Sequence, residues 1–323
     1  MLNAAVAGLE LFCNRHGLGA LGQYDRESIM RLGDEDPSSH FEDHTGRGGM
    51  GFGGGGGGGA LGLIFSLVAS KFGIVGIIIL ALGYCALTSL GGGGGILGGG
   101  GPTASAPTGK STLEPTTQDL VLRVLGSTER RWTEQFAAAG QQYQPTTLVF
   151  YRGGTQSGCG AAQSAMGPFY CPSDQKIYLD TDFFNELSQR FGAPGDFAMA
   201  YVVAHEVGHH IQNLTGTLEQ AQQAQSGSSR AAGNQIQVGV ELQADCYAGV
   251  WAANDKNLME PGDLEEGMRA AEAIGDDTLQ KQMQGTVVPE SFTHGSAAQR
   301  QEALMRGYRG GNPQACEGFT EGI

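Results

Sequence analysis

An uncharged apolar segment between two glycine runs constrains this chain more than any other feature. Residues 72–90 carry no charged side chain and are rich in Ile, Leu, Val, Gly and Ala. This is about the length that a helix needs to cross a bilayer. Polyglycine at 53–59 and 91–95 separates the segment from packed neighbours, which favours a transmembrane anchor over 60–90 rather than a buried core helix. A cleaved signal peptide is disfavoured because the segment lies far from the N-terminus.

The glycine excess belongs to this region and not to the whole chain. Of the 55 glycines, 24 lie within residues 46–101. We therefore expect a largely disordered cytoplasmic segment at 1–59, the anchor, a flexible stalk at 91–117 and a folded domain at 118–323. Basic residues concentrate before the anchor. This bias predicts a single-pass protein whose N-terminus lies in the cytoplasm and whose domain lies on the other side of the membrane, which in a bacterium is the periplasmic side of the inner membrane.

The net charge argues against one class of partner. The chain has 33 acidic and 19 basic residues, and its formal charge is −14. The phosphate backbone of a nucleic acid would be repelled by such a protein. We therefore expect no nucleic-acid partner.

The pattern of apolar residues in 118–323 indicates an α+β domain that is mostly helical with a small sheet. Helical spacing predicts an amphipathic helix over 120–136, and two short runs predict strands at 148–151 and 176–179, joined by a glycine-rich loop. A Gln- and Ala-rich stretch at 220–232 is expected to be mobile. Further helix starts are predicted at Asp196, at Asn234, at the pair Asp263 and Glu266, and at the pair Ser296 and Gln299.

The segment His205-Glu206-Val207-Gly208-His209 carries the chemistry. It lies inside the helix expected after Asp196, and residues four apart share one helical face, so both imidazoles can bind one zinc ion. Glu206 can then act as the general base toward the attacking water. The alternative is a pair of histidines that only pack within a helix. His210 lies on another side of the helix and is expected to be a packing or a surface histidine.

A third metal ligand is expected on the following helix. Glu241 and Asp245 are four residues apart and share a helical face. Apolar residues surround them, which suggests that both acids point into a site rather than into solvent. We assign Glu241 as the third zinc ligand and Asp245 as the acceptor that orients a ligating histidine. A solvated acidic pair is the alternative interpretation.

Four segments of the chain together resemble the bacterial neutral zinc metallopeptidase family. They are His205-Glu206-Val207-Gly208-His209-His210, Glu241-Leu242-Gln243-Ala244-Asp245-Cys246, Gly167-Pro168-Phe169-Tyr170-Cys171-Pro172 and Phe292-Thr293-His294-Gly295. The resemblance covers nearly all of 118–323. It implies a membrane-anchored glutamate-zincin with a zincin-like fold, in which His205, His209 and Glu241 hold Zn2+.

A further likeness concerns His294 and Arg300. Thr293-His294-Gly295 followed by Arg300 is similar to the segment after the zinc site in prenyl-protease-type zincins. This likeness implies that His294 donates a hydrogen bond to the oxyanion formed during peptide hydrolysis, and that Arg300 supports the same transition state. A structural histidine, and an arginine paired with a surface acid, are the alternatives.

Four of the six cysteines lie in the expected domain. Cys159, Cys171, Cys246 and Cys316 allow three pairings, of which Cys159 with Cys171 and Cys246 with Cys316 is the simplest. Disulfides are expected if the domain lies outside the cytoplasm, and free thiols if it lies inside. A cysteine zinc site is disfavoured because no Cys-x-x-Cys pair occurs.

The start of the chain carries a second resemblance to the family. Met30-Arg31-Leu32-Gly33-Asp34 and the acidic stretch at 41–43 are similar to the first residues of family members. This similarity implies that Met30 is the initiator and that residues 1–29 lie upstream of the true start.

Together these features predict a membrane-anchored zinc endopeptidase. Glu206 would take a proton from the attacking water and deliver it to the leaving amine, while an extended peptide pairs with the strand at 176–179 or with the segment 167–172. The expected partners are a protein or peptide substrate and the lipid bilayer. The rival hypotheses are a catalytically silent, membrane-tethered zinc module that binds a partner, and a metal-free domain in which His205 and His209 only pack.

Overall fold

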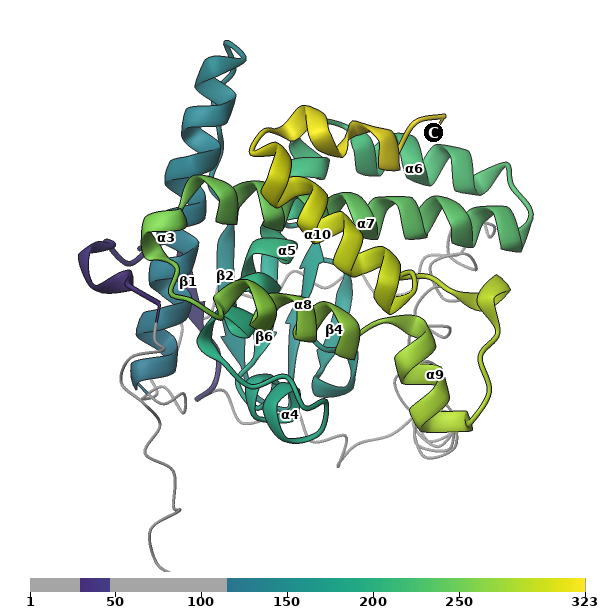
Figure 1. The fold of residues 1–323 in the computed structure, drawn as a ribbon, viewed down its shortest axis with the longest axis horizontal. Helices are drawn as coiled ribbons and strands as arrows, with labels where there is room; N and C mark the ends of the chain where they lie inside the picture. The colour runs from purple at the N-terminus through teal and green to yellow at the C-terminus, as the bar shows by residue number, and fades with distance from the viewer. Residues whose placement is uncertain (1–29, 47–114, 323) are drawn as a thin grey trace, which may run out of the picture.

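A small mixed sheet forms one part of the fold. The computed structural model describes residues 30–46 and 115–322 (Figure 1). The strand order is β1-β2-β6-β5; β1, β2 and β6 are parallel, and β5 is antiparallel to β6. A separate antiparallel hairpin consists of β3 and β4. The strands are β1 (Phe41–Asp43), β2 (Thr147–Tyr151), β3 (Gly154–Ser157), β4 (Gly160–Gln163), β5 (Phe169–Cys171) and β6 (Lys176–Asp180).

The sheet contains the two predicted strands and adds others. β2 and β6 confirm the strands predicted at 148–151 and 176–179, and they pair along their whole length. Both are central strands whose residues are almost all buried, which agrees with their nearly continuous apolar runs. The connection between them is more than the predicted loop, because it contains β3, β4 and β5.

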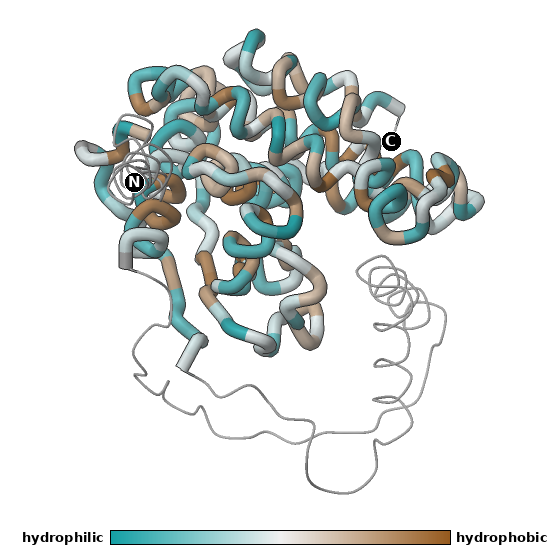
Figure 2. Tube along the Cα trace, turned by 60° about the horizontal axis from the view of Figure 1, so that its bottom comes forward, coloured by the Kyte–Doolittle hydropathy of each residue, from teal (hydrophilic) through white to brown (hydrophobic). Residues whose placement is uncertain are grey.

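Helices make up most of the described chain and confirm the predicted α+β class. α5 is the central helix and contacts α3, α7 and α8, while α10 packs along α7. Figure 2 shows hydrophobic and hydrophilic stretches alternating along the helices, as expected for elements with one face in a core. The helices are α3 (Pro115–Ala138), α4 (Phe183–Gln189), α5 (Asp196–Leu214), α6 (Thr217–Ser226), α7 (Arg230–Asn254), α8 (Asp263–Ala273), α9 (Asp276–Gln284) and α10 (Ala297–Gly310), with short 3-10 turns at Leu32–Asp34, Ser164–Met166, Lys256–Leu258, Pro289–Ser291 and Pro313–Phe319.

The stretch predicted to be mobile at 220–232 is instead a helical hairpin. α6 ends at Ser226, and α7 begins only a few residues later. The side chain of Ser229 caps α7 by accepting a hydrogen bond from the backbone N–H of Ala232. Asn234 therefore lies inside α7 and does not start it.

Glycines occupy two helix starts where acidic caps were predicted. Gly195 is the N-cap of α5 and Gly262 is the N-cap of α8, so Asp196 and Asp263 are the first residues inside these helices. Because glycine has no side chain, neither helix start has the side-chain capping hydrogen bond that was predicted. The capping box predicted from Ser296 to Gln299 at the start of α10 is confirmed.

Residues 30–46 belong to the fold, contrary to the prediction of a largely disordered segment over 1–59. β1 pairs with β2, and the side chains of Met30 and Leu32 are buried in the main core. Residues 30–46 are therefore an integral part of the domain.

The predicted anchor at 60–90 lies outside the described residues, as does nearly all of the predicted stalk at 91–117. Within 30–46 and 115–322, no helix combines the length and the apolar character that a membrane crossing requires.

Both predicted disulfides are present. Cys159, between β3 and β4, is bonded to Cys171 at the end of β5, with a Cα–Cα distance of 5.8 Å. Cys246 of α7 is bonded to Cys316, with a Cα–Cα distance of 5.6 Å. The second bond ties the C-terminal segment to the helix that carries Glu241.

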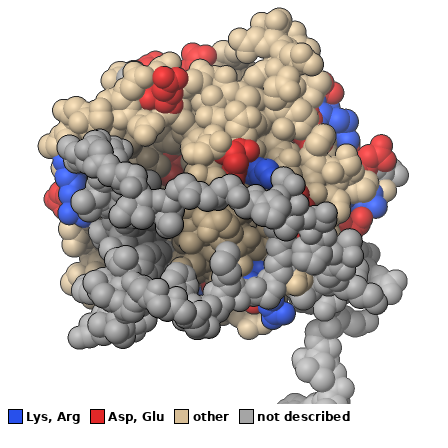
Figure 3. All heavy atoms as spheres, turned by 180° about the vertical axis from the view of Figure 1, so that it is seen from behind, with Lys and Arg blue, Asp and Glu red and all other residues tan. Residues whose placement is uncertain are grey.

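Charged side chains lie mostly at the surface. On the face shown in Figure 3, acidic and basic groups of the described residues occur at several separate positions. Exposed pairs such as Arg123 with Asp119 contribute little to stability because water screens them. The fold is therefore stabilised chiefly by its apolar core.

Candidate metal centre

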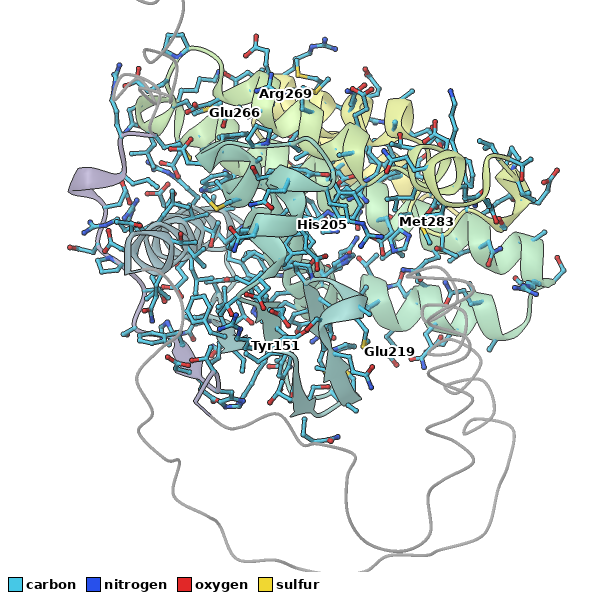
Figure 4. All side chains as sticks on the ribbon, turned by 90° about the horizontal axis from the view of Figure 1, so that it is seen from below. Tyr151, His205, Glu219, Glu266, Arg269 and Met283 are labelled. Carbon is cyan, nitrogen blue, oxygen red and sulfur yellow. A yellow bond between two sulfur atoms is a disulfide. The ribbon has the colours of Figure 1, made fainter. Side chains whose placement is uncertain are left out.

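Helix α5 brings His205, Glu206 and His209 into the interior. Residues 202–208 of this helix are all buried, and Figure 4 shows His205 well inside the molecule. Gly208 allows α5 to approach α7 closely, because a Cβ at this position would lie 2.9 Å from the carbonyl oxygen of Ala244. The close crossing of the two helices places the acids of α7 beside the histidines.

The three predicted ligands meet at one point. Nε2 of His205 lies 3.3 Å from Oε2 of Glu241, and Nε2 of His209 lies 3.5 Å from the same oxygen. One ligand atom of each side chain lies within 4.8 Å of the others. Ligands placed ~2.0–2.1 Å from a tetrahedral zinc ion are ~3.4 Å apart, so these distances fit zinc. Two imidazoles and one carboxylate also form a donor set that is typical of catalytic zinc.

The other nitrogen of each imidazole is held by a partner. Nδ1 of His205 lies 2.8 Å from Oδ1 of Asp245, and Nδ1 of His209 lies 2.8 Å from Oε1 of Gln212. A proton on Nδ1 leaves the lone pair of Nε2 for a metal. The predicted position of Asp245 behind a ligating histidine agrees with this geometry.

Asp245 is at the centre of a buried hydrogen-bond network. Its oxygens accept hydrogen bonds from the hydroxyl of Tyr201 at 2.6 Å and from Nε and Nη2 of Arg300, each at 2.9 Å. Arg300 is buried and lies on the Nδ1 side of His205, away from the nitrogen that faces Glu241. Arg300 thus pairs with a buried acid and not with the surface acid of the alternative interpretation, and its transition-state role stays a prediction.

The charges around the ligands favour ionised side chains. Burial by itself would lower the pKa of His205, but Asp245 and Glu241 raise it to about 10. Burial would raise the pKa of Glu241, yet the two histidines hold it well below its usual value. Burial would also raise the pKa of Asp245, but Arg300 and His205 lower it below its usual value. A divalent cation at this point would take the place of a proton on the histidines.

Glu206 presents a buried oxygen that has no protein partner. Its Oε2 accepts no hydrogen bond within the described part of the chain. Burial raises the pKa of Glu206, although the neighbouring histidines oppose this effect. An unpaired buried polar atom costs about 1–3 kcal/mol, so its presence indicates a group that meets a water or a substrate. A carboxyl group with a raised pKa also suits proton transfer near neutral pH.

His294 lies near Glu241, one of the three ligands. Its Nδ1 is 3.2 Å from Oδ1 of Asp276, whose Oδ2 accepts hydrogen bonds from the backbone N–H groups of residues 293–295. His294 is close enough to Glu241 for each to affect the pKa of the other. Its side chain is 29% exposed. The contact with Asp276 leaves Nε2 as the nitrogen that can reach a substrate.

Four supporting residues were missed in the sequence. Tyr201 lies four residues before His205, Gln212 lies three residues after His209, and Gln237 lies four residues before Glu241, to which it donates a hydrogen bond at 3.0 Å. Helical spacing could have found these three. Asp276 could not be found in this way, because it is distant in sequence from His294 and meets it only through the tertiary fold.

His210 is a packing histidine and not a surface one, which decides between the two expected alternatives. It is buried, and its Nδ1 lies 3.0 Å from the hydroxyl of Tyr170 in β5. Its Nε2 donates to the carbonyl oxygen of Gln144 at 2.6 Å. These contacts tie the edge of the sheet to the helix that carries the metal ligands.

Comparisons with known proteins show the family to which the chain belongs. The chain matches the model of the family described as "Putative neutral zinc metallopeptidase" over residues 30–319. "Uncharacterized protein YpfJ" of Escherichia coli K12 is 50% identical over 202 residues, which cover 62% of this chain and 70% of the relative. "Uncharacterized protein Mb2605" of Mycobacterium bovis is 48% identical over 191 residues, which cover 55% of this chain and 64% of the relative. No solved structure matches the chain.

Proposed function

Because the chain belongs to the neutral zinc metallopeptidase family, we propose that it is a zinc-dependent endopeptidase acting on protein or peptide substrates. The observation that carries this proposal is the convergence of His205, His209 and Glu241 beside the buried carboxyl group of Glu206. A structural zinc site usually has four protein ligands and needs no general base. Three ligands with an adjacent base instead favour catalysis over a silent zinc-binding module.

The side chains of the site divide the reaction between them. When bound, zinc supplies Lewis-acid chemistry that polarises a carbonyl group and makes water nucleophilic at neutral pH. Glu206 accepts the proton of the attacking water and passes it to the leaving amine. His294, held by Asp276, donates from Nε2 to the carbonyl oxygen as negative charge develops there. Arg300 and Asp245 keep the ring of His205 in place.

Strand β5 is the edge with which an extended substrate can pair. β6 lies between β2 and β5, so its backbone groups are already used, and the predicted pairing of a substrate with 176–179 is wrong. β1 and β5 are the two edge strands of this sheet, and β5 is the one that contacts the metal helix α5. The hydroxyl of Tyr170 contacts His210 and Asn213 of α5, which holds β5 beside the metal helix. A peptide added to this edge would run past that helix.

We also propose that residues 60–90 hold the domain at the periplasmic face of the inner membrane. The two disulfides support an oxidising compartment. The pairing of β1 with β2 supports an arrangement in which both ends of this segment lie on the side of the domain, in place of the single crossing expected from the sequence. In spheroplasts, His40→Cys and Glu302→Cys variants should both react with a membrane-impermeant maleimide. Labelling of position 40 only after lysis would contradict this arrangement.

The hydrolytic function is tested with the full-length, zinc-loaded protein and a fluorogenic casein substrate. Glu206→Gln should lower kcat/KM by ~10²–10⁴-fold while zinc remains bound, because it removes the base and keeps the ligands. Glu219→Gln, which changes an exposed acid on α6 (Figure 4), should leave kcat/KM unchanged. Equal activity of wild type and Glu206→Gln would favour the silent zinc module instead.

A further inference from the structure

Three carboxylates crowd together at the start of α5, about two and a half turns before the metal ligands. Asp196, Asp263 and Glu266 each place an oxygen within 4.8 Å of the other two. The two aspartates are buried, and the side chain of Glu266 is 17% exposed. Gly195 has a φ of 126°, and a Cβ at this position would overlap the carboxylate of Glu266. The close approach of the three acids therefore depends on this glycine.

Little positive charge balances this cluster. Arg269, labelled beside Glu266 in Figure 4, brings Nη2 only to 4.0 Å from Oε1 of Glu266, and its side chain is half exposed. Burial and the neighbouring acids raise the pKa of Asp263 to about 6 and that of Glu266 to about 7. Buried carboxylates of like charge disfavour one another, so the cluster is suited to a cationic partner.

A nitrogen atom from a distant part of the chain already lies in the cluster. The backbone nitrogen of Met30 donates to Oδ2 of Asp196 at 2.5 Å, and Met30 is only 4% exposed. The next residue fixes this position, since the N–H of Arg31 donates to the carbonyl oxygen of Leu258 at 2.7 Å and its guanidinium pairs with Glu260. The match to the family model also begins at residue 30.

We propose that the cluster of Asp196, Asp263 and Glu266 binds the chain's own amino terminus, with the α-ammonium group at Met30. A peptide N–H offers one donor and no charge, whereas an α-ammonium group offers a positive charge and three donors, one for each carboxylate. Translation that starts at Met30, followed by hydrolytic removal of the formyl group as formate, produces this α-ammonium group. Because Asp196 is the first residue of α5, the ion pair fixes the start of the helix that carries His205 and His209.

The first test is the amino terminus of the protein isolated from its native cells. Mass spectrometry of the N-terminal peptide should identify a chain that begins at Met30 with a free α-amino group. A peptide that maps to residues 1–29 would overturn the proposal. This measurement does not depend on zinc or on peptidase activity, so its outcome is separate from that of the proposed function.

The second test measures how fast an acetylating reagent modifies the α-amino group of the chain that begins at Met30. An ammonium held by three carboxylates has a raised pKa, so acetylation near pH 8 should be at least ~10-fold slower in the folded than in the unfolded protein. Glu266→Gln should increase the rate several-fold, and Glu265→Gln, which changes the exposed neighbouring acid, should not. Equal rates in folded and unfolded protein would overturn the proposal. A tightly bound divalent metal that is lost in Asp196→Asn would also overturn it, because the cluster would then be a metal site.

Discussion

Asp245 is the residue at which the metal centre and the stability of the fold depend on each other. Its oxygens contact Tyr201, His205 and Arg300, all within 2.9 Å. Asp245→Asn removes the negative charge and replaces one acceptor oxygen with an amide that can only donate. This amide then faces a donor of Arg300, which is 2% exposed and would remain as a buried cation without its anion.

The size of the effect follows from these contacts. Breaking a buried ion pair on one side costs ~3–5 kcal/mol, and we expect this loss in the free energy of unfolding of the metal-free protein. Zinc affinity should fall ~10–100-fold, because the ring of His205 loses its orienting acceptor. Tyr201→Phe is the matched control, since it removes one neutral donor to the same carboxylate. Tyr201→Phe should lower the free energy of unfolding by only ~1 kcal/mol and leave zinc affinity nearly unchanged.

Urea unfolding of the metal-free protein measures the free energy of unfolding. Zinc competition with a chromophoric chelator measures the affinity for zinc. An Asp245→Asn variant that matches wild type in both would refute the network. A variant that loses stability but binds zinc like wild type would refute the orienting role of Asp245 while leaving its structural role intact.

Three further predictions concern the scaffold. Replacing Cys246 and Cys316 with alanine opens a loop with a sequence separation of 70 residues and should cost ~4 kcal/mol in urea unfolding; a loss below ~1 kcal/mol would contradict this. Gly208→Ala should lower the free energy of unfolding by ~1–3 kcal/mol and weaken zinc binding, because the added methyl group forces α5 away from Ala244. An unchanged Tm would show that α5 and α7 can accommodate the methyl group. In the metal-free protein, the pKa of His205 is raised from 6.5 to about 10, so its stabilising effect is complete below about pH 6.5 and is lost as the pH rises to about 10. The urea midpoint of wild type should fall between about pH 6.5 and pH 10, and His205→Gln should lack the part of this fall that is due to His205. Identical pH profiles of the two proteins would contradict the raised pKa of His205.

Local spacing was sufficient to predict which side chains share a helical face. His205 and His209 are one helical turn apart, as are Glu241 and Asp245, so each pair could be recognised without knowing the tertiary fold. Their convergence depends on the crossing of α5 and α7 at Gly208, which no local pattern reveals. The placement of Arg300 behind Asp245 is likewise a result of how α10 packs on α7.

The errors in the fold have two physical causes. β1 has only three residues, too few for a periodic pattern, and its partner β2 lies more than a hundred residues later in the chain. The stretch at 220–232 is rich in Gln and Ala, which favour helices, but its biased composition was interpreted as mobility. Packing of α6 against α7 then stabilises it as a hairpin.

The zinc content of the full-length protein tests the central claim most directly. We expect wild type to bind about one zinc ion per chain through His205, His209 and Glu241, and Glu241→Ala to bind zinc at least ~10-fold more weakly because one of three ligands is lost. Glu219→Ala, an exposed acid on α6, should bind zinc like wild type. A folded wild-type protein that takes up no zinc when incubated with the metal, or a Glu241→Ala variant with wild-type affinity, would contradict the three-ligand site.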